Sequence, residues 1–205
     1  MKITIQAMQL RSAAHGMATR DIRYYLNGLL IEATKTQTIA VGTDGHMIVV
    51  NRCEAENEID DNVNLIIPDE VVKAMIASAK KRKSEAVVIE SSGDKWSFQH
   101  DLGDIVFSPI EGRFPDWKQI FSKTDQQCEP CSTLPMLSPA IFQRGCKAHT
   151  DFTGGSPLNF PRPQRTGDDG SLVLLIGEDV VVAIMPMRDR SEPKQIPAWV
   201  LTHPE

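Results

Sequence analysis

The chain has 205 residues, of which 41% are hydrophobic and 24% are charged, and its formal net charge is −5. This length suits one large domain or two small ones, and the apolar share is enough for a packed core. No run of about 18 apolar residues is present, so we expect no membrane span. The acidic balance argues weakly against a chain coated by nucleic acid, but it leaves room for a local basic surface. The strand-like start lacks the apolar core of a signal peptide, which favours a cytoplasmic protein.

The first part of the sequence alternates between strand and helix patterns. Residues 1–5 predict a strand, and residues 6–18 predict a helix because apolar side chains recur there at helical spacing. Residues 22–33 predict a pair of strands or one long bent strand, and residues 38–41 predict another. The predicted order is therefore strand, helix and then several strands.

A turn and a buried strand follow at residues 43–50. Asp44-Gly45 is a strong signal for a tight turn, because Gly accepts positive φ and Asp bonds to its own following backbone. Residues 48–50 are β-branched, which is typical of a buried strand. Taken alone, the stretch favours an ordinary hairpin. We interpret it instead as one wall of an apolar pocket that is the working part of the protein.

A second unit repeats this order. Residues 65–67 predict a strand, and Pro68 opens a helix with acidic residues in its first turn, where the helix dipole favours them. Three further strands are predicted at residues 86–90, 96–100 and 105–107. Residues 1–122 therefore hold two βαβββ units, and repetition at this scale predicts a duplicated α+β fold.

The rest of the chain has weaker patterns. Residues 122–170 are rich in proline and glycine and predict loops, with one helix at residues 138–147. Residues 171–176 and 180–185 predict a hairpin. Residues 189–205 carry three prolines and predict a poorly ordered tail.

Four passages, taken together and in this order, resemble the bacterial sliding clamp, the beta subunit of DNA polymerase III. They are DIRYYLNG at 21–28, TDGH at 43–46, EGRFPDW at 111–117 and MPMR at 185–188. Each passage is short, but the ordered set is specific. The resemblance implies a DNA-clamp fold, in which duplicated βαβββ units carry their helices on one face of antiparallel sheets, and it implies a protein that is not an enzyme.

The resemblance covers the chain unevenly. Residues 1–122 resemble the family's middle domain, residues 123–188 resemble the C-terminal part of its last domain as a reduced clamp domain, and residues 189–205 form a tail. Family clamps have three such domains per chain, and two chains close a ring around DNA. Because this chain holds fewer, we expect ring closure to need a homo-oligomer of three two-domain chains or four smaller ones.

The family binds short linear peptides of DNA polymerases, the clamp loader and repair proteins in a pocket between its middle and last domains. The corresponding residues here are Leu26, Thr43, Gly45, His46, Met47, Ile48, Pro115, Gln119, Ile120, Ala183, Met185 and Pro186. Met47 and Gln119 stand where many relatives carry Arg, and Ala183 stands where a larger aliphatic residue is common, so we expect a less basic and slightly wider pocket. We also expect Ile48→Asp to abolish peptide binding without unfolding the domain.

The resemblance further implies sequence-independent contact with double-stranded DNA. The residues concerned are Arg11, Arg20, Arg23, Tyr24, Tyr25, Lys73, Lys80 and Lys81. Such contacts with phosphate and sugar are non-specific and sensitive to salt. The alternative for residues 80–83 is a solvated helix end that interacts with the helix dipole.

Two hypotheses follow for the function. The first is a sliding-clamp-like processivity factor that tethers replication or repair proteins and encircles DNA as an oligomer. The second is a non-encircling adaptor or decoy, which keeps the peptide pocket and competes with a full clamp for its partners. The mass in solution distinguishes them, because a stable monomer excludes the ring.

Catalysis and cofactors find little support in the sequence. The five histidines show no paired nucleophile, and no Gly-rich phosphate loop is present, so we expect no catalytic residue and no cofactor. Cys128-x₂-Cys131 and Cys146-x₂-His149 have zinc-like spacing, but free thiols in an irregular segment are the simpler interpretation, and we predict no metal.

The tail contains a segment of interest at residues 195–201. It begins with Gln and ends in bulky apolar residues, as clamp-binding peptides do. We hypothesise that this segment occupies a pocket, its own or that of a neighbouring molecule. The alternative is a disordered tail.

Overall fold

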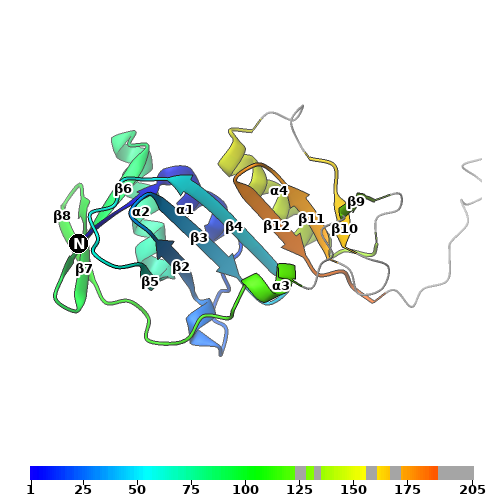
Figure 1. Cartoon of the computed structure of the whole chain (residues 1–205), viewed down its shortest axis with the longest axis horizontal. Helices are drawn as coiled ribbons and strands as arrows, with labels where there is room; N and C mark the ends of the chain where they lie inside the picture. The colour runs from blue at the N-terminus through cyan, green and yellow to red at the C-terminus, as the bar shows by residue number, and fades with distance from the viewer. Residues whose placement is uncertain (123–127, 132–134, 156–160, 167–171, 189–205) are drawn as a thin grey trace, which may run out of the picture.

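The computed structural model describes residues 1–122, 128–131, 135–155, 161–166 and 172–188. These residues form two sheets, of four and eight strands, in which every pairing is antiparallel, and the long helices lie together on one face (Figure 1). No helix in the described part of the chain is long and apolar enough to cross a membrane. The hypothesis about residues 195–201 concerns a segment outside the described residues.

The first βαβββ unit occupies the start of the chain. Its elements are β1 (Lys2–Gln6), α1 (Ala7–Ala14), the 3₁₀ turn η1 (Tyr24–Leu26), β2 (Gly28–Ala33), β3 (Gln37–Thr43) and β4 (Met47–Glu54). The predicted strand at residues 22–33 is wrong in its first half. Asn27 closes residues 21–27 into a loop, because its side chain accepts a bond from the Asp21 N–H at 2.9 Å and donates one to the Asp21 carbonyl at 2.8 Å.

The second unit repeats the first. Its elements are β5 (Val63–Pro68), α2 (Asp69–Arg82), β6 (Ala86–Ser92), β7 (Lys95–His100) and β8 (Gly103–Phe107). All five elements were predicted. Helix α2 ends at Lys83, which adopts the left-handed conformation with φ of 52°, after a last turn of basic residues that suits the helix dipole.

The two units exchange their first strands. The four-stranded sheet has the order β1-β6-β7-β8, and the larger sheet begins β5-β2-β3-β4. In this register Ile3 lies opposite Ile89, and Leu65 lies opposite Ile31. All four side chains are buried in one core beneath α1 and α2, so neither unit completes its sheet without the other.

A third group of elements follows. These are α3 (Lys118–Ser122), β9 (Cys128–Pro130), α4 (Pro139–Thr153), β10 (Gln164–Thr166), β11 (Val173–Ile176) and β12 (Val180–Ile184). The β11–β12 hairpin agrees with the sequence, and α4 continues past residue 147 until Gly154, whose φ is 84°. The short elements α3, β9 and β10 were not predicted, because three to five residues carry too little periodicity.

Strand β12 pairs with β4, which extends the larger sheet to the order β5-β2-β3-β4-β12-β11-β10-β9. Val182 lies opposite Val49 near the centre of this pairing. Helix α4 packs closely over β12, because a Cβ on Gly145 would lie 2.9 Å from the Ile184 Cδ1 atom. The division of the chain into domains at residues 1–122 and 123–188 stays a prediction.

Candidate functional site

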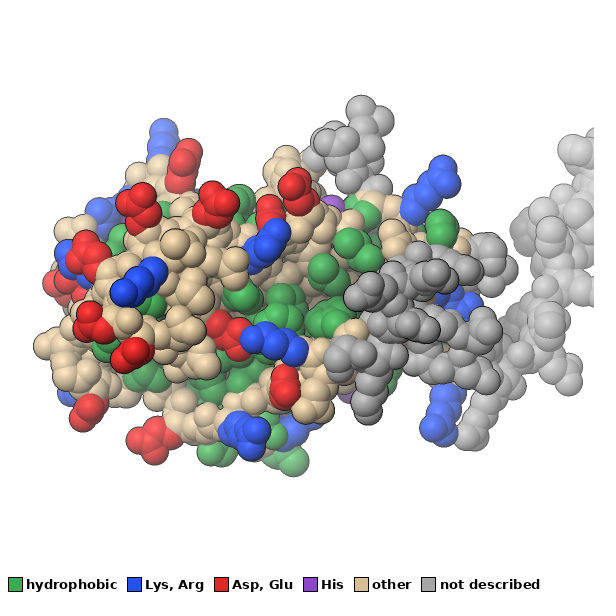
Figure 2. Space-filling view, in the orientation of Figure 1, with side chains coloured by type: hydrophobic (Ala, Val, Ile, Leu, Met, Phe, Trp, Pro, Cys, Tyr) green, Lys and Arg blue, Asp and Glu red, His purple; other side chains and the backbone are tan. Residues whose placement is uncertain are grey.

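A cavity of about 280 Å³ opens on the face of the sheet opposite the helices, where β4 meets β12. Hydrophobic side chains gather over these strands, and charged side chains of both signs surround them (Figure 2). The residues that line the cavity are Arg23, Leu26, Thr43, Gly45, His46, Met47, Ile48, Pro115, Trp117, Ile120, Leu172, Ala183 and Met185. We call this cavity the β4–β12 pocket.

Ten of the twelve residues predicted for a peptide pocket line this cavity, and the other two, Gln119 and Pro186, do not. The Gln119 side chain donates to the Asp116 carboxylate at 3.0 Å, which holds it on its own segment. Arg23, Trp117 and Leu172 also line the cavity and were not predicted to do so. Trp117 belongs to the EGRFPDW passage, and Arg23 was predicted to contact DNA. That a peptide binds in the pocket stays a prediction.

The turn at residues 43–46 is held by its own side chains. The Asp44 Oδ1 atom accepts the N–H groups of His46 at 2.8 Å and Met47 at 2.9 Å. The Thr43 hydroxyl accepts the Gly45 N–H at 3.1 Å and donates to the Met47 carbonyl at 2.8 Å. Gly45 has a φ of 89°, which an L side chain rarely adopts. The sequence signal for a tight turn is therefore confirmed.

The floor of the pocket is apolar and its rim is accessible. Ile48 and Ala183 lie opposite each other in the β4–β12 pairing and are 3% and 2% exposed. Met185 and Ile120 on the rim are 54% and 37% exposed. The Met185 N–H donates to the His46 carbonyl at 2.9 Å, which ties the rim to the turn.

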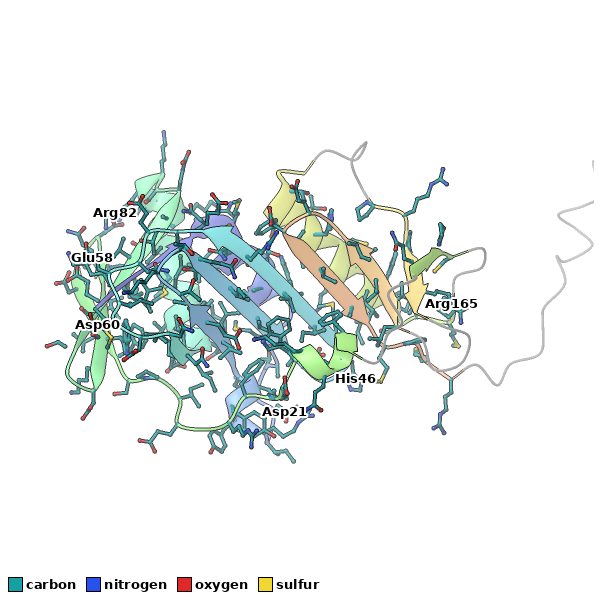
Figure 3. All side chains as sticks on the ribbon, viewed as in Figure 1. Asp21, His46, Glu58, Asp60, Arg82 and Arg165 are labelled. Carbon is teal, nitrogen blue, oxygen red and sulfur yellow. The ribbon has the colours of Figure 1, made fainter. Side chains whose placement is uncertain are left out.

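Arg23 supplies the positive charge at the pocket mouth. Its guanidinium lies 2.7 Å from the Asp21 carboxylate, and its NH2 group donates to the Asp44 carbonyl at 3.2 Å. Hydrogen bonds from the Arg23 side chain and backbone lower the pKa of Asp21 to about 2, and the Asp21 bond raises the pKa of Arg23. Asp21 and His46 lie along the lower edge of the molecule in the view of Figure 3.

The residues predicted to contact DNA fall in two places. Arg11 lies on α1, and the lysines lie on α2, where Lys73 pairs with Asp69 at 2.6 Å and Lys81 pairs with Asp101 at 3.0 Å. Arg20, Arg23, Tyr24 and Tyr25 lie on or beside η1, and the two tyrosine rings meet edge to face at 5.7 Å. Three of the six predicted cations therefore already have an acidic partner within the chain: Arg23, Lys73 and Lys81.

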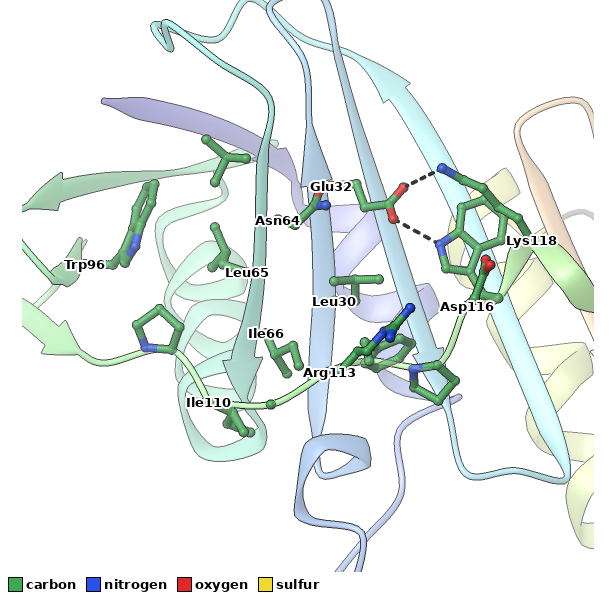
Figure 4. A pocket seen from close by; sticks show the side chains of 16 residues that line it. Leu30, Glu32, Asn64, Leu65, Ile66, Trp96, Ile110, Arg113, Asp116 and Lys118 are labelled. Atoms are coloured by element: carbon green, nitrogen blue, oxygen red, sulfur yellow. Dashed lines mark hydrogen bonds and ion pairs between the residues drawn. The ribbon is translucent and has the colours of Figure 1, made fainter.

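A second cavity, of about 470 Å³, lies beside β2 and β5 under the segment 109–118 (Figure 4). Its polar centre is Glu32, which accepts the Trp117 indole N–H at 3.3 Å and pairs with Lys118 at 3.4 Å. Pro115 and Trp117 line this cavity and the β4–β12 pocket, so the segment that carries them forms a wall between the two. No sequence signal pointed to this second cavity.

The described residues contain no group of three or more His, Cys, Asp or Glu side chains placed to hold a metal ion. Cys146 and His149 lie on α4, and burial lowers the pKa of His149 and raises that of the Cys146 thiol. The Cys128 side chain lies outside the described residues. A zinc site therefore gains no support from the part of the chain that the structure describes.

Two βαβββ units that exchange their first strands, with helices on one face, define the DNA-clamp fold. A solved DNA polymerase sliding clamp from Pseudomonas aeruginosa superposes with a TM-score of 0.63 at 17% identity, over 91% of this chain and 66% of that one. Residues 3–116, more than half of the chain, match the family described as DNA polymerase III beta subunit, central domain. The chain belongs to this beta sliding clamp family, whose members are not enzymes.

Two relatives define the extent of the similarity. The beta sliding clamp of Escherichia coli strain K12 is 29% identical over 157 residues, which cover 75% of this chain and 40% of that protein. The beta sliding clamp of Pseudomonas putida strain KT2440 is 27% identical over 116 residues, which cover 56% of this chain and 31% of that protein. The chain therefore spans well under half the length of either relative.

Proposed function

We propose that this chain is a cytoplasmic, sliding-clamp-like tethering factor that binds short linear motifs of DNA polymerases, clamp loaders or repair proteins in the β4–β12 pocket. The observation that carries the proposal is the convergence of ten predicted residues, from segments far apart in the sequence, on one cavity. Its apolar floor and accessible methionine rim suit bulky side chains of varied shape.

Double-stranded DNA is the second proposed partner. Helices α1 and α2 lie on the face opposite the pocket and carry Arg11, Lys73, Lys80 and Lys81. A protein that encircles DNA needs contacts with phosphate that carry no sequence information. On this proposal, several copies of the chain associate so that these helices face the duplex.

Peptide binding tests the pocket. We expect a fluorescent peptide that begins with Gln and ends in bulky apolar residues to bind the wild-type chain, and Met185→Asp to weaken binding roughly tenfold or more, as at a hot spot. Leu102→Asp is the matched control, because Leu102 is an apolar side chain that is 91% exposed in the turn between β7 and β8. Equal affinity of wild type and Met185→Asp would overturn the proposal.

Ile48 is a poorer choice for this experiment than the sequence suggested. It is 3% exposed and belongs to the apolar cluster beneath the pocket, so Ile48→Asp would bury a carboxylate. Burying an unpaired charge is strongly unfavourable. The expectation that the fold tolerates Ile48→Asp is therefore not supported, whereas Met185 is exposed enough to accept a charge.

The non-encircling adaptor remains the second candidate, and strand β8 favours it. β8 has five residues against eight in β4, the corresponding strand of the first unit, and among the described residues it pairs only with β7. Asp104 is its second residue and follows Gly103, whose φ is 118°, and Asp101 lies in the turn just before the strand. A short edge that carries acidic side chains resists pairing with a further strand.

Mass measurement in solution separates the two candidates. A closed trimer or tetramer that stays on circular DNA and is lost when the circle is cut supports encirclement. A monomer that binds the peptide and leaves circular DNA unbound supports the adaptor.

A further inference from the structure

Arg144 on α4 reaches from the helix layer to the turn that forms the pocket. Its Nε and NH2 groups donate to the His15 carbonyl at 3.1 and 2.9 Å, and NH2 also donates to the Asp44 Oδ2 atom at 2.8 Å. The guanidinium thus joins α4, the end of α1 and the turn after β3. No sequence motif singled out this residue.

The partner of Arg144 shapes the pocket. Asp44 uses Oδ2 for Arg144 and Oδ1 for the N–H groups of His46 and Met47, so one carboxylate is bound on both of its oxygens. His46 and Met47 both line the β4–β12 pocket. The Asp44 carboxylate therefore bonds to the backbone of both residues, and Arg144 holds its second oxygen.

We propose that Arg144 is a positioning residue for the β4–β12 pocket. It acts through its bond to Asp44 to hold the turn in the conformation that binds a ligand. This proposal rests on the proposed peptide-binding function. Arg144 would link the helix layer to the pocket on the opposite face of the sheet. The ion pair therefore adds a link between α4 and the turn to the direct packing of α4, at Gly145, against Ile184 and Met47.

The ion pair is shielded enough to hold a conformation. The Asp44 side chain is 15% exposed and that of Arg144 is 37% exposed, whereas those of the Arg52–Asp179 pair are 57% and 43% exposed. The Arg52 pair also bridges β4 and the β11–β12 hairpin, with a distance of 2.7 Å, but it contacts no residue of the turn. It therefore serves as a matched control, because its loss would weaken the link between β4 and the β11–β12 hairpin without removing a bond to the turn.

The first experiment compares Arg144→Gln with Arg52→Gln. We expect Arg144→Gln to weaken binding of the fluorescent peptide roughly tenfold, the scale of a lost hydrogen bond between charged groups. We expect Arg52→Gln to leave affinity within about twofold, since exposed ion pairs contribute little. Arg144→Lys should recover part of the affinity, because one ammonium can replace the bond to Asp44 without the full fork to His15. Equal losses in Arg144→Gln and Arg52→Gln would overturn the proposal.

The second experiment does not depend on the peptide. Hydrogen exchange of the His46 and Met47 amides should accelerate in Arg144→Gln and stay unchanged in Arg52→Gln, while the amides of β2 and β3 keep their protection in both. Unchanged exchange at His46 and Met47 would overturn the positioning role. If the wild-type chain does not bind the peptide, the proposed function fails, while the exchange rates still decide whether Arg144 holds the turn.

Discussion

The Arg144 guanidinium lies 2.8 Å from the Asp44 carboxylate, although the two residues are 100 positions apart in the sequence. This pair connects a helix on one face of the sheet to a turn that shapes a cavity on the other. Two faces that are distinct in the DNA-clamp fold therefore share a structural link in this chain.

Gly45→Ala should damage both the fold and the pocket. Gly45 has a φ of 89°, and a Cβ there would lie 3.0 Å from the Arg23 NH1 atom. We expect about 1–2 kcal/mol lower stability from the left-handed conformation and a displaced Arg23. The control is Gly93→Ala. Gly93 has a φ of 63°, and a Cβ there would have no atom within 4 Å, so this variant should lose only the stability that the backbone conformation costs. Denaturant midpoints measure stability. If peptide binding weakens in Gly45→Ala but not in Gly93→Ala, the damage to the pocket is separate from the loss of stability.

Lys80→Gln should weaken DNA binding more than Lys73→Gln. Lys73 is held by Asp69 at 2.6 Å on the same helix, whereas Lys80 is exposed and has no ion pair among the described residues. An unpaired lysine releases more counterions when it meets phosphate, so the salt slope of binding should fall by about one in Lys80→Gln. Affinities measured at several salt concentrations test this difference. Identical salt slopes for the two variants and the wild type would show that these lysines of α2 do not contact DNA.

Stability should fall as the pH drops below about 6.5, and His149 should cause part of that loss. Burial lowers the pKa of His149 from its usual 6.5, so in this range the unfolded chain binds a proton that the folded chain does not. Stability falls with decreasing pH wherever the unfolded state holds more protons. Urea midpoints at pH 7.5 and 5.5 measure the loss, which should be smaller in His149→Gln.

The Asp21 carboxylate should titrate at a pH near 2. The side-chain and backbone hydrogen bonds from Arg23 lower its pKa from 3.8 to about 2. The folded state therefore gains from this ion pair above pH 4, and the gain disappears as the pH falls from about 4 to about 2. Carbon NMR of the Asp21 carboxyl group measures the value directly. In Arg23→Gln we expect it to return toward 3.8, and an unchanged pKa would show that Arg23 does not cause the shift.

Much of the fold and part of the site could be predicted from local chemistry. Apolar side chains marked β3, β6 and β7, and acidic residues after Pro68 marked the start of α2. The Asp44-Gly45 turn was evident because both residues favour it wherever they occur together. Residues 22–27 were assigned wrongly to a strand, since the loop depends on two bonds between Asn27 and Asp21.

Long-range contacts decided the rest. Nothing local indicates that β1 belongs to the sheet of β6 and that β5 belongs to the sheet of β2, because an exposed strand edge accepts any partner of suitable register. The sequence by itself determined the longer strands and helices and which turn stands beside the pocket. Only the tertiary structure brought β12 against β4, enclosed the pocket between them, and placed Arg144 where its charge meets Asp44.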